Sequence, residues 1–149
     1  MEPGALIDIV RKAFANVKLD DGIGLWEAQA IDDYEPESTQ RAKRATDEKE
    51  SWGSIPSHEL QRCHSSLCFF DAKGMRFHLP AFIVASIRGE VDDPVFHLTN
   101  LDDYSASKLT ALNAAQKQAV SEYLTWCSEQ EDYDFERPSI KEALDNYWS

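Results

Sequence analysis

Possible zinc ligands gather in the middle of the chain. Five histidines and cysteines occur within 21 positions: His58, Cys63, His64, Cys68 and His78. Structural zinc sites hold the metal with imidazole and thiolate groups at short, paired spacings such as C-x-x-C. This stretch has no such pair, and the neighbours Cys63 and His64 would point in different directions on a helix. We therefore predict no metal and no cofactor, and ordinary core and surface roles for these side chains.

A thiol nucleophile is the second chemistry that these residue types could support. Cys63 directly precedes His64, and Cys127 lies in a later segment. A catalytic cysteine needs a histidine within hydrogen-bond reach and a group that orients this histidine. Neighbours on a helix do not face each other, and no orienting acid is evident. The sequence therefore predicts no catalytic residue.

Carboxylates form two groups that could serve in acid–base catalysis or hold a divalent cation. The groups are Glu27, Asp32 and Asp33, and Asp47, Glu48 and Glu50. In a chain with 27 acidic residues, such groups arise by chance, so solvent-exposed helix faces are the simpler interpretation. A small hydrolase or metal-dependent enzyme that uses the first group or the histidines is the alternative to the function predicted below. A housekeeping scaffold or regulatory domain is a third hypothesis.

The net charge is strongly negative and unevenly distributed. The formal charge is −12 at pH 7, whereas nucleic-acid binders need a positive surface. Residues 1–88 hold 14 acidic and 11 basic groups, and residues 89–149 hold 13 acidic and 4 basic groups. Solubility explains this charge most simply. The sharper interpretation is a C-terminal surface that suits a basic protein partner, with no nucleic acid.

Length and hydropathy limit the number of domains and the cellular location that we expect. The chain has 149 residues, of which 42% are hydrophobic, enough for the core of one domain. No segment approaches the ~18 uninterrupted apolar residues of a membrane span, so we expect no membrane partner. The N-terminus lacks the apolar h-region of a secretory signal. With three cysteines and no such signal, reduced thiols in the cytoplasm fit best. The oligomeric state is left open.

The most apolar stretch, Leu67–Arg88, organises the predicted fold. Leu67–Phe70 resembles a short strand, and the run from Asp71 to Gly74 resembles a turn that needs a positive φ at the glycine. Apolar residues at 75, 77 and 79 then alternate with Arg76 and His78, a period of two that indicates a second strand. Pro80 would end this strand and begin a buried helix, with Gly89 after its last turn. A longer strand is the alternative, because several residues between 81 and 87 are β-branched.

Helical patterns occupy most of the remaining chain. They cover about residues 5–17, 25–34, 37–50, 57–63, 116–127 and 138–147, and Asn113 with Gln116 resembles a capping box. Val95–Leu98 could form a third short strand, and Asn100–Thr110 is expected to be a loop. Helices surround the strands without alternating with them, which argues against a parallel sheet.

The sequence thus predicts a single α+β domain over residues 1–149. It would be mainly helical and packed around an antiparallel hairpin at about residues 66–79, with a buried central helix at about 80–88. Arg76 would pair with a carboxylate such as Asp71, with anion binding as the alternative. The residues expected to have structural roles in this region are Asp71, Gly74, Arg76, Phe77 and Pro80.

A family resemblance accompanies this central stretch. Phe70–Phe82 resembles the F-x-D-x-x-G-x-R-F-x-L-P-A-[FY] signature of a bacterial family of unknown function. Weaker likenesses to its other motifs lie at Leu25–Tyr34, at Asp47–Ile55 and at Gln116–Leu124. The resemblance spans roughly Ile7 to Leu124, so the residues after Ser128 lie outside it. It implies no reaction.

The chain also resembles a broader type of protein in its small size and acidic composition. Small acidic proteins of this kind are similar to the immunity proteins encoded beside secreted bacterial toxins. We therefore expect a non-catalytic binding protein that neutralises a cognate toxin with a basic or cation-lined surface.

The predicted contact surface is the acidic segment between the last two helices. Aromatic residues within an acidic surround can form an interface centre with a charged rim. The expected partner-binding residues are Glu129, Glu131, Asp132, Tyr133, Asp134, Phe135 and Glu136. The next candidates are the acids beside Tyr34 (Asp32, Asp33 and Glu35) and beside Tyr104 (Asp102 and Asp103). The simpler alternative is a loop whose aromatics fold into the core.

Overall fold

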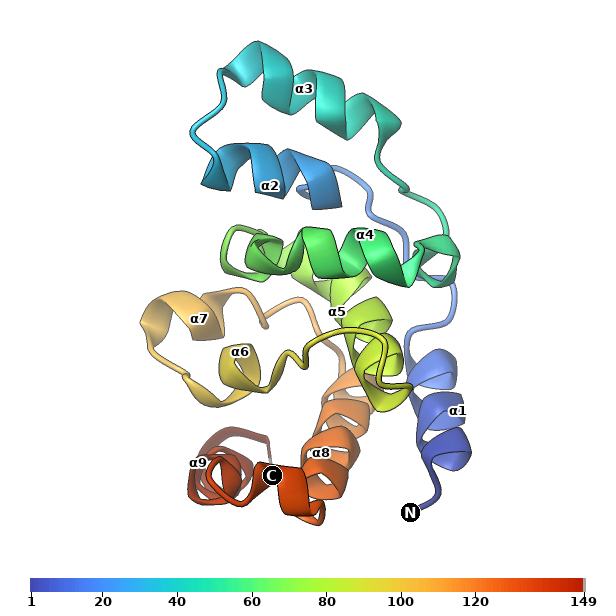
Figure 1. The fold of residues 1–149 in the computed structure, drawn as a ribbon, viewed down its shortest axis with the longest axis vertical. Helices are drawn as coiled ribbons and strands as arrows, with labels where there is room; N and C mark the ends of the chain where they lie inside the picture. The colour runs from blue at the N-terminus through green and yellow to red at the C-terminus, as the bar shows by residue number, and fades with distance from the viewer. Residues whose placement is uncertain (149) are drawn as a thin grey trace.

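Every regular element in the part of the chain that the structure describes, residues 1–148, is helical (Figure 1). The structure is a computed structural model. In chain order the elements are α1 (Pro3–Ala13), α2 (Leu25–Asp32), α3 (Glu37–Thr46), η1 (Trp52–Ser54), α4 (Ser57–Arg62), η2 (His64–Cys68), α5 (Ala72–Ile87), α6 (Val95–Thr99), α7 (Asp103–Ser107), α8 (Ala114–Ser128), η3 (Glu131–Tyr133), α9 (Arg137–Ala143) and η4 (Leu144–Trp148). The predicted α+β class is therefore wrong, and the described chain is all-α.

The predicted hairpin is replaced by η2 and by the first half of α5. Asp71 does not open a turn between strands but caps α5, because its side chain accepts a hydrogen bond from the backbone N–H of Gly74 at 2.8 Å. The same carboxylate oxygen accepts the N–H of Ile23 at 3.0 Å. Asp71 therefore starts the helix and ties it to the loop that precedes α2.

The alternation that suggested a strand arises because α5 is buried on almost every side. Residues 74 to 85 are all buried except Arg76, and His78 is completely buried although it is polar. A helix that is apolar all round shows no 3.6-residue period. Its polar positions 76 and 78 then produce an accidental period of two. Burial on all sides thus removed the signal that separates a helix from a strand.

Gly74 is needed for close packing and not for the left-handed conformation that a hairpin turn would require. It lies inside the first turn of α5, and a Cβ at this position would come within 2.6 Å of the backbone carbonyl oxygen of Ile23. Pro80 likewise lies inside α5 and not at its start. Since proline has no N–H, it gives no helical hydrogen bond to the carbonyl of residue 76. The boundary expected at Pro80 is therefore wrong.

The helix end predicted at Gly89 is confirmed. Of the other predicted elements, some are present and some are replaced by short helices. Gly89 has φ +73°, directly after α5. The helices expected between about residues 5 and 63 are present as α1 to α4, and Asn113 and Gln116 form the expected capping box at α8. Val95–Leu98 belongs to the short helix α6 and not to a strand, and α7 interrupts the loop expected at Asn100–Thr110.

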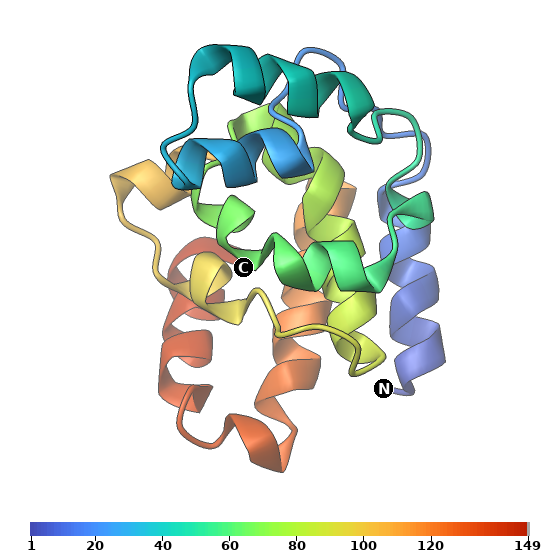
Figure 2. The same ribbon diagram turned by 45° about the horizontal axis from the view of Figure 1, so that its top comes forward.

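The helices pack in tiers around α5, as Figures 1 and 2 show. α1, η1 and α4 contact α5, and α1 also packs against α8. At one end α2 contacts both α3 and η2, whereas at the other end α8, α9 and η4 pack together with α6 against α9. This arrangement leaves α2 and α3 as an outer pair that rests on η2, on the opposite end of the molecule from α9.

Candidate functional site

The first turn of α2 is held by a carboxylate from the far end of α3. Asp47 accepts hydrogen bonds from the backbone N–H groups of Trp26 at 2.9 Å and Glu27 at 3.1 Å. Glu27 in turn accepts the N–H of Gly24 at 2.8 Å. Residue 24 has to be a glycine, because a Cβ there would overlap the Asp47 carboxylate. These bonds satisfy donors that the start of a helix leaves unpaired.

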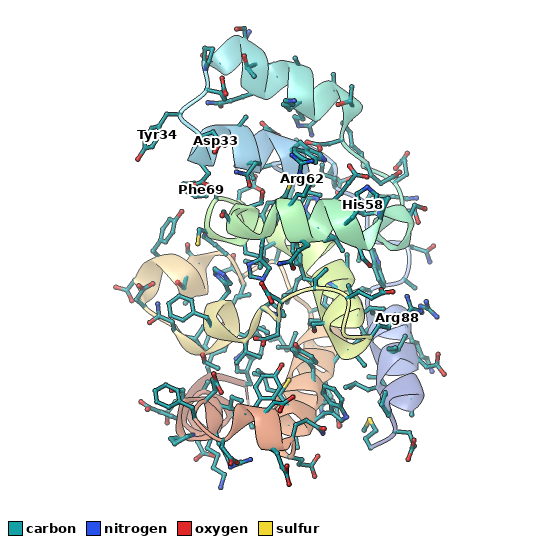
Figure 3. The ribbon with its side chains drawn as sticks, in the orientation of Figure 1. Asp33, Tyr34, His58, Arg62, Phe69 and Arg88 are labelled. Carbon is teal, nitrogen blue, oxygen red and sulfur yellow. The ribbon has the colours of Figure 1, made fainter. Side chains whose placement is uncertain are left out.

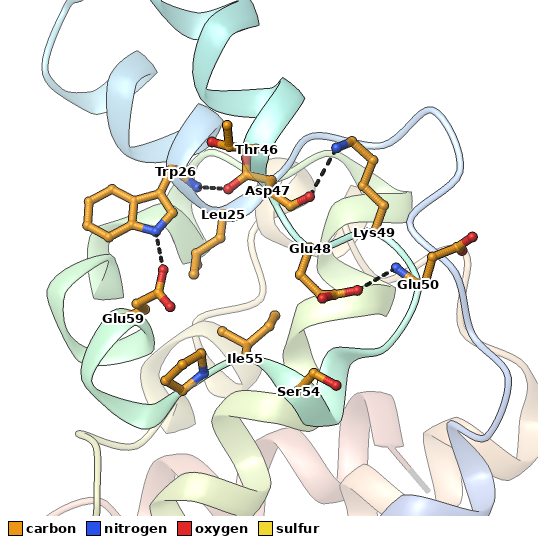
Figure 4. A pocket seen from close by; sticks show the side chains of 11 residues that line it. Leu25, Trp26, Thr46, Asp47, Glu48, Lys49, Glu50, Ser54, Ile55 and Glu59 are labelled. Atoms are coloured by element: carbon orange, nitrogen blue, oxygen red, sulfur yellow. Dashed lines mark hydrogen bonds between the residues drawn. The ribbon is translucent and has the colours of Figure 1, made fainter.

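Beside this contact lies a cleft between α2, the segment 46–50 and the start of α4 (Figure 4). Its volume is about 550 Å³, which is within the range of ~300–1,000 Å³ that small ligands occupy. The apolar lining comes from Leu25, Trp26, Ile55 and Pro56. The charged lining comes from Asp47, Glu48, Lys49, Glu50 and Glu59. Four carboxylates thus line the cleft with a single ammonium group.

Hydrogen bonds fix three of these carboxylates. Glu48 accepts the backbone N–H groups of Glu50 and Ser51, both at 3.0 Å, and these bonds hold its pKa below the usual range. Glu59 accepts the indole N–H of Trp26 at 2.8 Å. Asp47 is only 7% exposed, and burial raises its pKa although two N–H groups donate to it. The acceptor groups of the cleft are therefore held in place before any ligand arrives.

The single ammonium of the cleft points back to the main chain. Lys49 Nζ donates to the carbonyl oxygens of Asp47 at 3.0 Å and Ala45 at 3.4 Å. Its two hydrogen bonds therefore go to backbone carbonyl oxygens at the end of α3. Of the other carboxylates, Glu50 lies 3.8 Å from the ammonium of Lys18, and Glu48 accepts two backbone N–H groups.

Trp26 presents its ring to cations. Lys43 Nζ and Arg62 Cζ each lie 5.9 Å from its ring centroid, while its N–H is engaged by Glu59. An indole face attracts an ammonium or guanidinium group through its quadrupole. Lys43 and Arg62 of this protein already lie beside the ring, so the carboxylates of the cleft are the groups that would attract a cationic side chain from a partner.

The structure brings together only one of the two clusters of carboxylates found in the sequence. Asp47, Glu48 and Glu50 meet in the cleft. The other group is split along α2, where Glu27 lies 3.5 Å from Arg44 at one end and Asp33 accepts from Gln29 at 3.3 Å near the other. Sequence reasoning missed Glu59 as a member of the cleft. No local signal could have found it, because the segments 46–50 and 54–59 meet only through the fold.

The predicted partner-binding segment, residues 129–136, divides into an inward part and an outward part. Tyr133 is half-buried in η3, and its hydroxyl donates to Asp93 at 3.0 Å. Phe135 is 92% exposed. Arg137 holds the segment by donating to the carbonyl oxygens of Ser128 at 2.7 Å and Gln130 at 3.1 Å.

The remaining partner-binding candidates of this segment are acids at its surface. Glu129, Glu131, Asp132, Asp134 and Glu136 are exposed. Asp134 is paired with Arg137 at 2.5 Å. Tyr133 thus joins the interior of the protein, and Phe135 is the aromatic side chain that this segment leaves to solvent.

The histidine and cysteine residues are dispersed. His78 is buried in α5, stacked on Phe70 and bonded through Nδ1 to the Gly74 carbonyl at 2.7 Å. Burial raises the pKa of the Cys63 and Cys127 thiols to about 12, which makes them poor nucleophiles at neutral pH. Across residues 1–148, no three side chains of metal-binding type come together in a geometry that could hold an ion.

Arg76, for which the sequence suggested a carboxylate partner such as Asp71, lies beside a different carboxylate. Its guanidinium lies 3.5 Å from Asp20 instead. Its Nε is buried and has no hydrogen-bond partner, so the residue joins the first half of α5 to the loop before α2 by a long contact. Phe77, the neighbouring structural candidate, is completely buried.

Comparison with known proteins gives a family but no activity. No curated protein and no solved structure matches the chain. None of the helices in residues 1–148 combines the length and the apolar character needed to cross a bilayer. The sequence model of the family of unknown function DUF6714 matches residues 4–149, which includes the acidic segment after Ser128 that the motif likeness had left outside. This chain belongs to the DUF6714 family.

Proposed function

We propose that this protein is a non-catalytic binding protein that neutralises a basic protein partner, in the manner of an immunity protein that binds its cognate antibacterial toxin. The observation that carries the proposal is the cleft, where four carboxylates and the Trp26 ring line one cavity of about 550 Å³. A lysine or arginine side chain from the partner would enter it.

The arrangement of the carboxylates supports binding more than catalysis. Both oxygens of Asp47 accept backbone N–H groups of α2, and Glu59 accepts the indole N–H of Trp26. These acids therefore shape and orient the cleft. Rigid acceptors of this kind recognise a charged donor without rearrangement, which reduces the entropic cost of association. The net charge of −12 would also speed the encounter with a basic partner.

A co-expression experiment tests the function. The reading frame encoded immediately upstream of the gene would be expressed alone and together with this protein, and cell growth would be measured. We expect the wild-type protein to restore growth. The purified pair would then be studied by surface plasmon resonance at two salt concentrations.

Two matched charge-removal variants locate the contact. The cleft variant carries Glu48→Gln, Glu50→Gln and Glu59→Gln, and the segment variant carries Glu131→Gln, Asp132→Asn and Glu136→Gln. Each removes three negative charges, and glutamine can still accept the N–H groups that Glu48 and Glu59 now accept. We expect the cleft variant to weaken binding ~30-fold or more, as removal of an interface centre does. The segment variant should mainly slow association, and more so at low salt.

Equal binding by the wild-type protein and the cleft variant, with both folded, would contradict the assignment of the cleft. A partner that lacks a basic surface, or an upstream protein that does not impair growth, would contradict the proposed function itself.

A further inference from the structure

Tyr34 occupies the left-handed position at the end of α2, where glycine is the usual residue. It follows α2 with φ +58°, where the N–H of Tyr34 bonds to Ile31 and that of Glu35 bonds to Ala30. Helix ends with this pattern usually place glycine at the left-handed position, because a Cβ is strained there. The tyrosine side chain is nevertheless 96% exposed. The helix-closing hydrogen bonds account for the left-handed conformation, but they do not account for an exposed aromatic side chain at this position.

Other aromatic rings lie on the same side of the molecule: Phe69 is half-buried, whereas Phe96 and Tyr104 are exposed. Figure 3 places Phe69 close to Tyr34 and Asp33, as expected because α2 packs on η2. The Tyr104 hydroxyl donates to the carbonyl of Cys68 at 3.0 Å, which puts its ring beside residue 69. Tyr104 is 62% exposed, and Phe96, which is 65% exposed, lines the same small hollow of about 210 Å³.

We name these four residues, Tyr34, Phe69, Phe96 and Tyr104, the aromatic face. Figures 1 and 2 both show the turn after α2 and the helix α7 on one side of the fold. Three segments that are far apart in the sequence thus contribute to a single surface. Scattered exposed aromatics need no explanation, but a group of them indicates an interaction site.

The chain segments that carry this face contribute acidic side chains and no basic ones. The segments 31–36, 64–70 and 94–105 contain five acidic residues and neither lysine nor arginine: Asp32, Asp33, Glu35, Asp102 and Asp103. Lys108 lies nearby but is buried. Its ammonium bonds to the carbonyls of Leu67 and Cys68 and lies 4.4 Å from the Tyr104 ring centroid, so it fixes that ring and is not available to a partner.

From this combination we infer that the aromatic face is a docking surface for a partner protein that presents an apolar recess surrounded by lysine and arginine, with Tyr34 as the anchor. Rigid aromatic anchors within a charged rim are typical of the energetic centre of interfaces. A second copy of this chain fits poorly, because it would bring two acidic surfaces together. The inference rests on the proposed function and names the surface that supplies its apolar contacts.

The test separates a binding role from a structural role at Tyr34. Glycine relieves the strained backbone and removes the ring, so Tyr34→Gly should raise the melting temperature by about 2–4 °C. The same variant should weaken binding of the partner ~30-fold, whereas Tyr34→Phe should bind within a few-fold of wild type. A melting temperature that falls in Tyr34→Gly would show that the ring supports the fold, and would overturn the inference.

Photo-crosslinking in the cells of origin identifies what covers the face. The photoreactive residue p-benzoylphenylalanine would replace Tyr34 and, as a control, the exposed Ala115 on α8. We expect strong crosslinks from position 34 alone, to a protein segment in which apolar residues lie beside lysine or arginine. Crosslinks to a second copy of this chain, or yields equal to those at position 115, would overturn the docking surface. If that happened while the cleft variant still lost its partner, the proposed function would stand without the aromatic face.

Discussion

The starts of α5 and of α2 are built alike, whereas the features beyond these starts differ. A carboxylate caps each helix, Asp71 for α5 and Asp47 for α2, and a glycine beside each contact leaves no room for a side chain. In α5 packing inside the protein explains Gly74, although the buried Nε of Arg76 and Nε2 of His78 have no hydrogen-bond partner. In and beside α2 the unusual features face solvent: an acidic cleft at one end and the strained Tyr34 at the other. Features that internal packing does not explain are the ones that point to a partner.

The largest effect is expected at the contact between α5 and the loop before α2. In Gly74→Ala the new methyl group would come within 2.6 Å of the Ile23 carbonyl oxygen. The backbone would have to shift, which should cost about 3 kcal/mol of unfolding free energy. Urea denaturation measures this loss of unfolding free energy. The control is Gly4→Ala, where the methyl group meets nothing within 4 Å and alanine favours the helix. A wild-type stability for Gly74→Ala would show that the loop does not press on α5.

Acid should destabilise the α5 region before it affects the cleft. Burial lowers the pKa of His78 to about 4, although its bond to Gly74 and the nearby Asp71 carboxylate act in the opposite direction. The unfolded chain binds a proton near pH 6.5, whereas the folded chain does not, so stability falls as the pH drops from 6.5 towards 4. Between pH 7 and pH 5 this should remove about 2 kcal/mol.

The variant His78→Phe isolates this contribution. It keeps an aromatic ring beside Phe70 and cannot be protonated, so its stability should change less between pH 7 and pH 5 than that of wild type. His97, whose pKa burial also lowers to about 4, adds a similar slope that both proteins share. Identical slopes in urea denaturation at the two pH values would contradict a buried, neutral His78.

A smaller effect is expected at the cap of α2. Asp47→Ala leaves the N–H groups of Trp26 and Glu27 without their acceptor and should cost about 1–2 kcal/mol. Hydrogen exchange should accelerate at these two amides. The control Glu50→Ala, an exposed residue of the same cleft, should stay within ~0.5 kcal/mol of wild type.

The smallest effect has the opposite sign. Tyr34→Gly should stabilise the protein by about 1 kcal/mol through relief of the left-handed conformation. Asn16, with φ +64°, is the matched position, and Asn16→Gly should gain less because asparagine tolerates this conformation. Thermal denaturation compares the stability of the two variants. Equal gains in stability at both positions would remove the argument that Tyr34 is strained.

The local signals in the sequence were sufficient for much of the helical structure. The capping box at Asn113 and the C-terminal glycine at Gly89 act through neighbouring residues, so sequence spacing reveals them. The hairpin was mistaken because a helix buried on all sides loses its period and because Asp71 followed by Gly74 fits a turn as well as a helix cap. Tertiary burial decided between these two structures.

The site was less accessible from sequence. The acidic groups at 32–33, 47–50 and 102–103 were visible, but nothing local showed that Glu59 closes the cleft or that Tyr34 and Tyr104 share one face. Equally, the acidic spacing at 129–136 could not reveal that Tyr133 bonds inward to Asp93. Such assignments depend on which segments the fold brings together.

The central claim, that the cleft accepts a cationic side chain, is tested most directly by NMR. A short arginine-containing peptide would be titrated into the ¹⁵N-labelled protein, with the same peptide carrying neutral citrulline as the control. We predict that the arginine peptide shifts the Trp26 indole resonance and the amides of Glu27, Glu48 and Glu50, and that both the citrulline peptide and the cleft variant show little change. Shifts of equal size with both peptides, or shifts that avoid the cleft, would contradict the account.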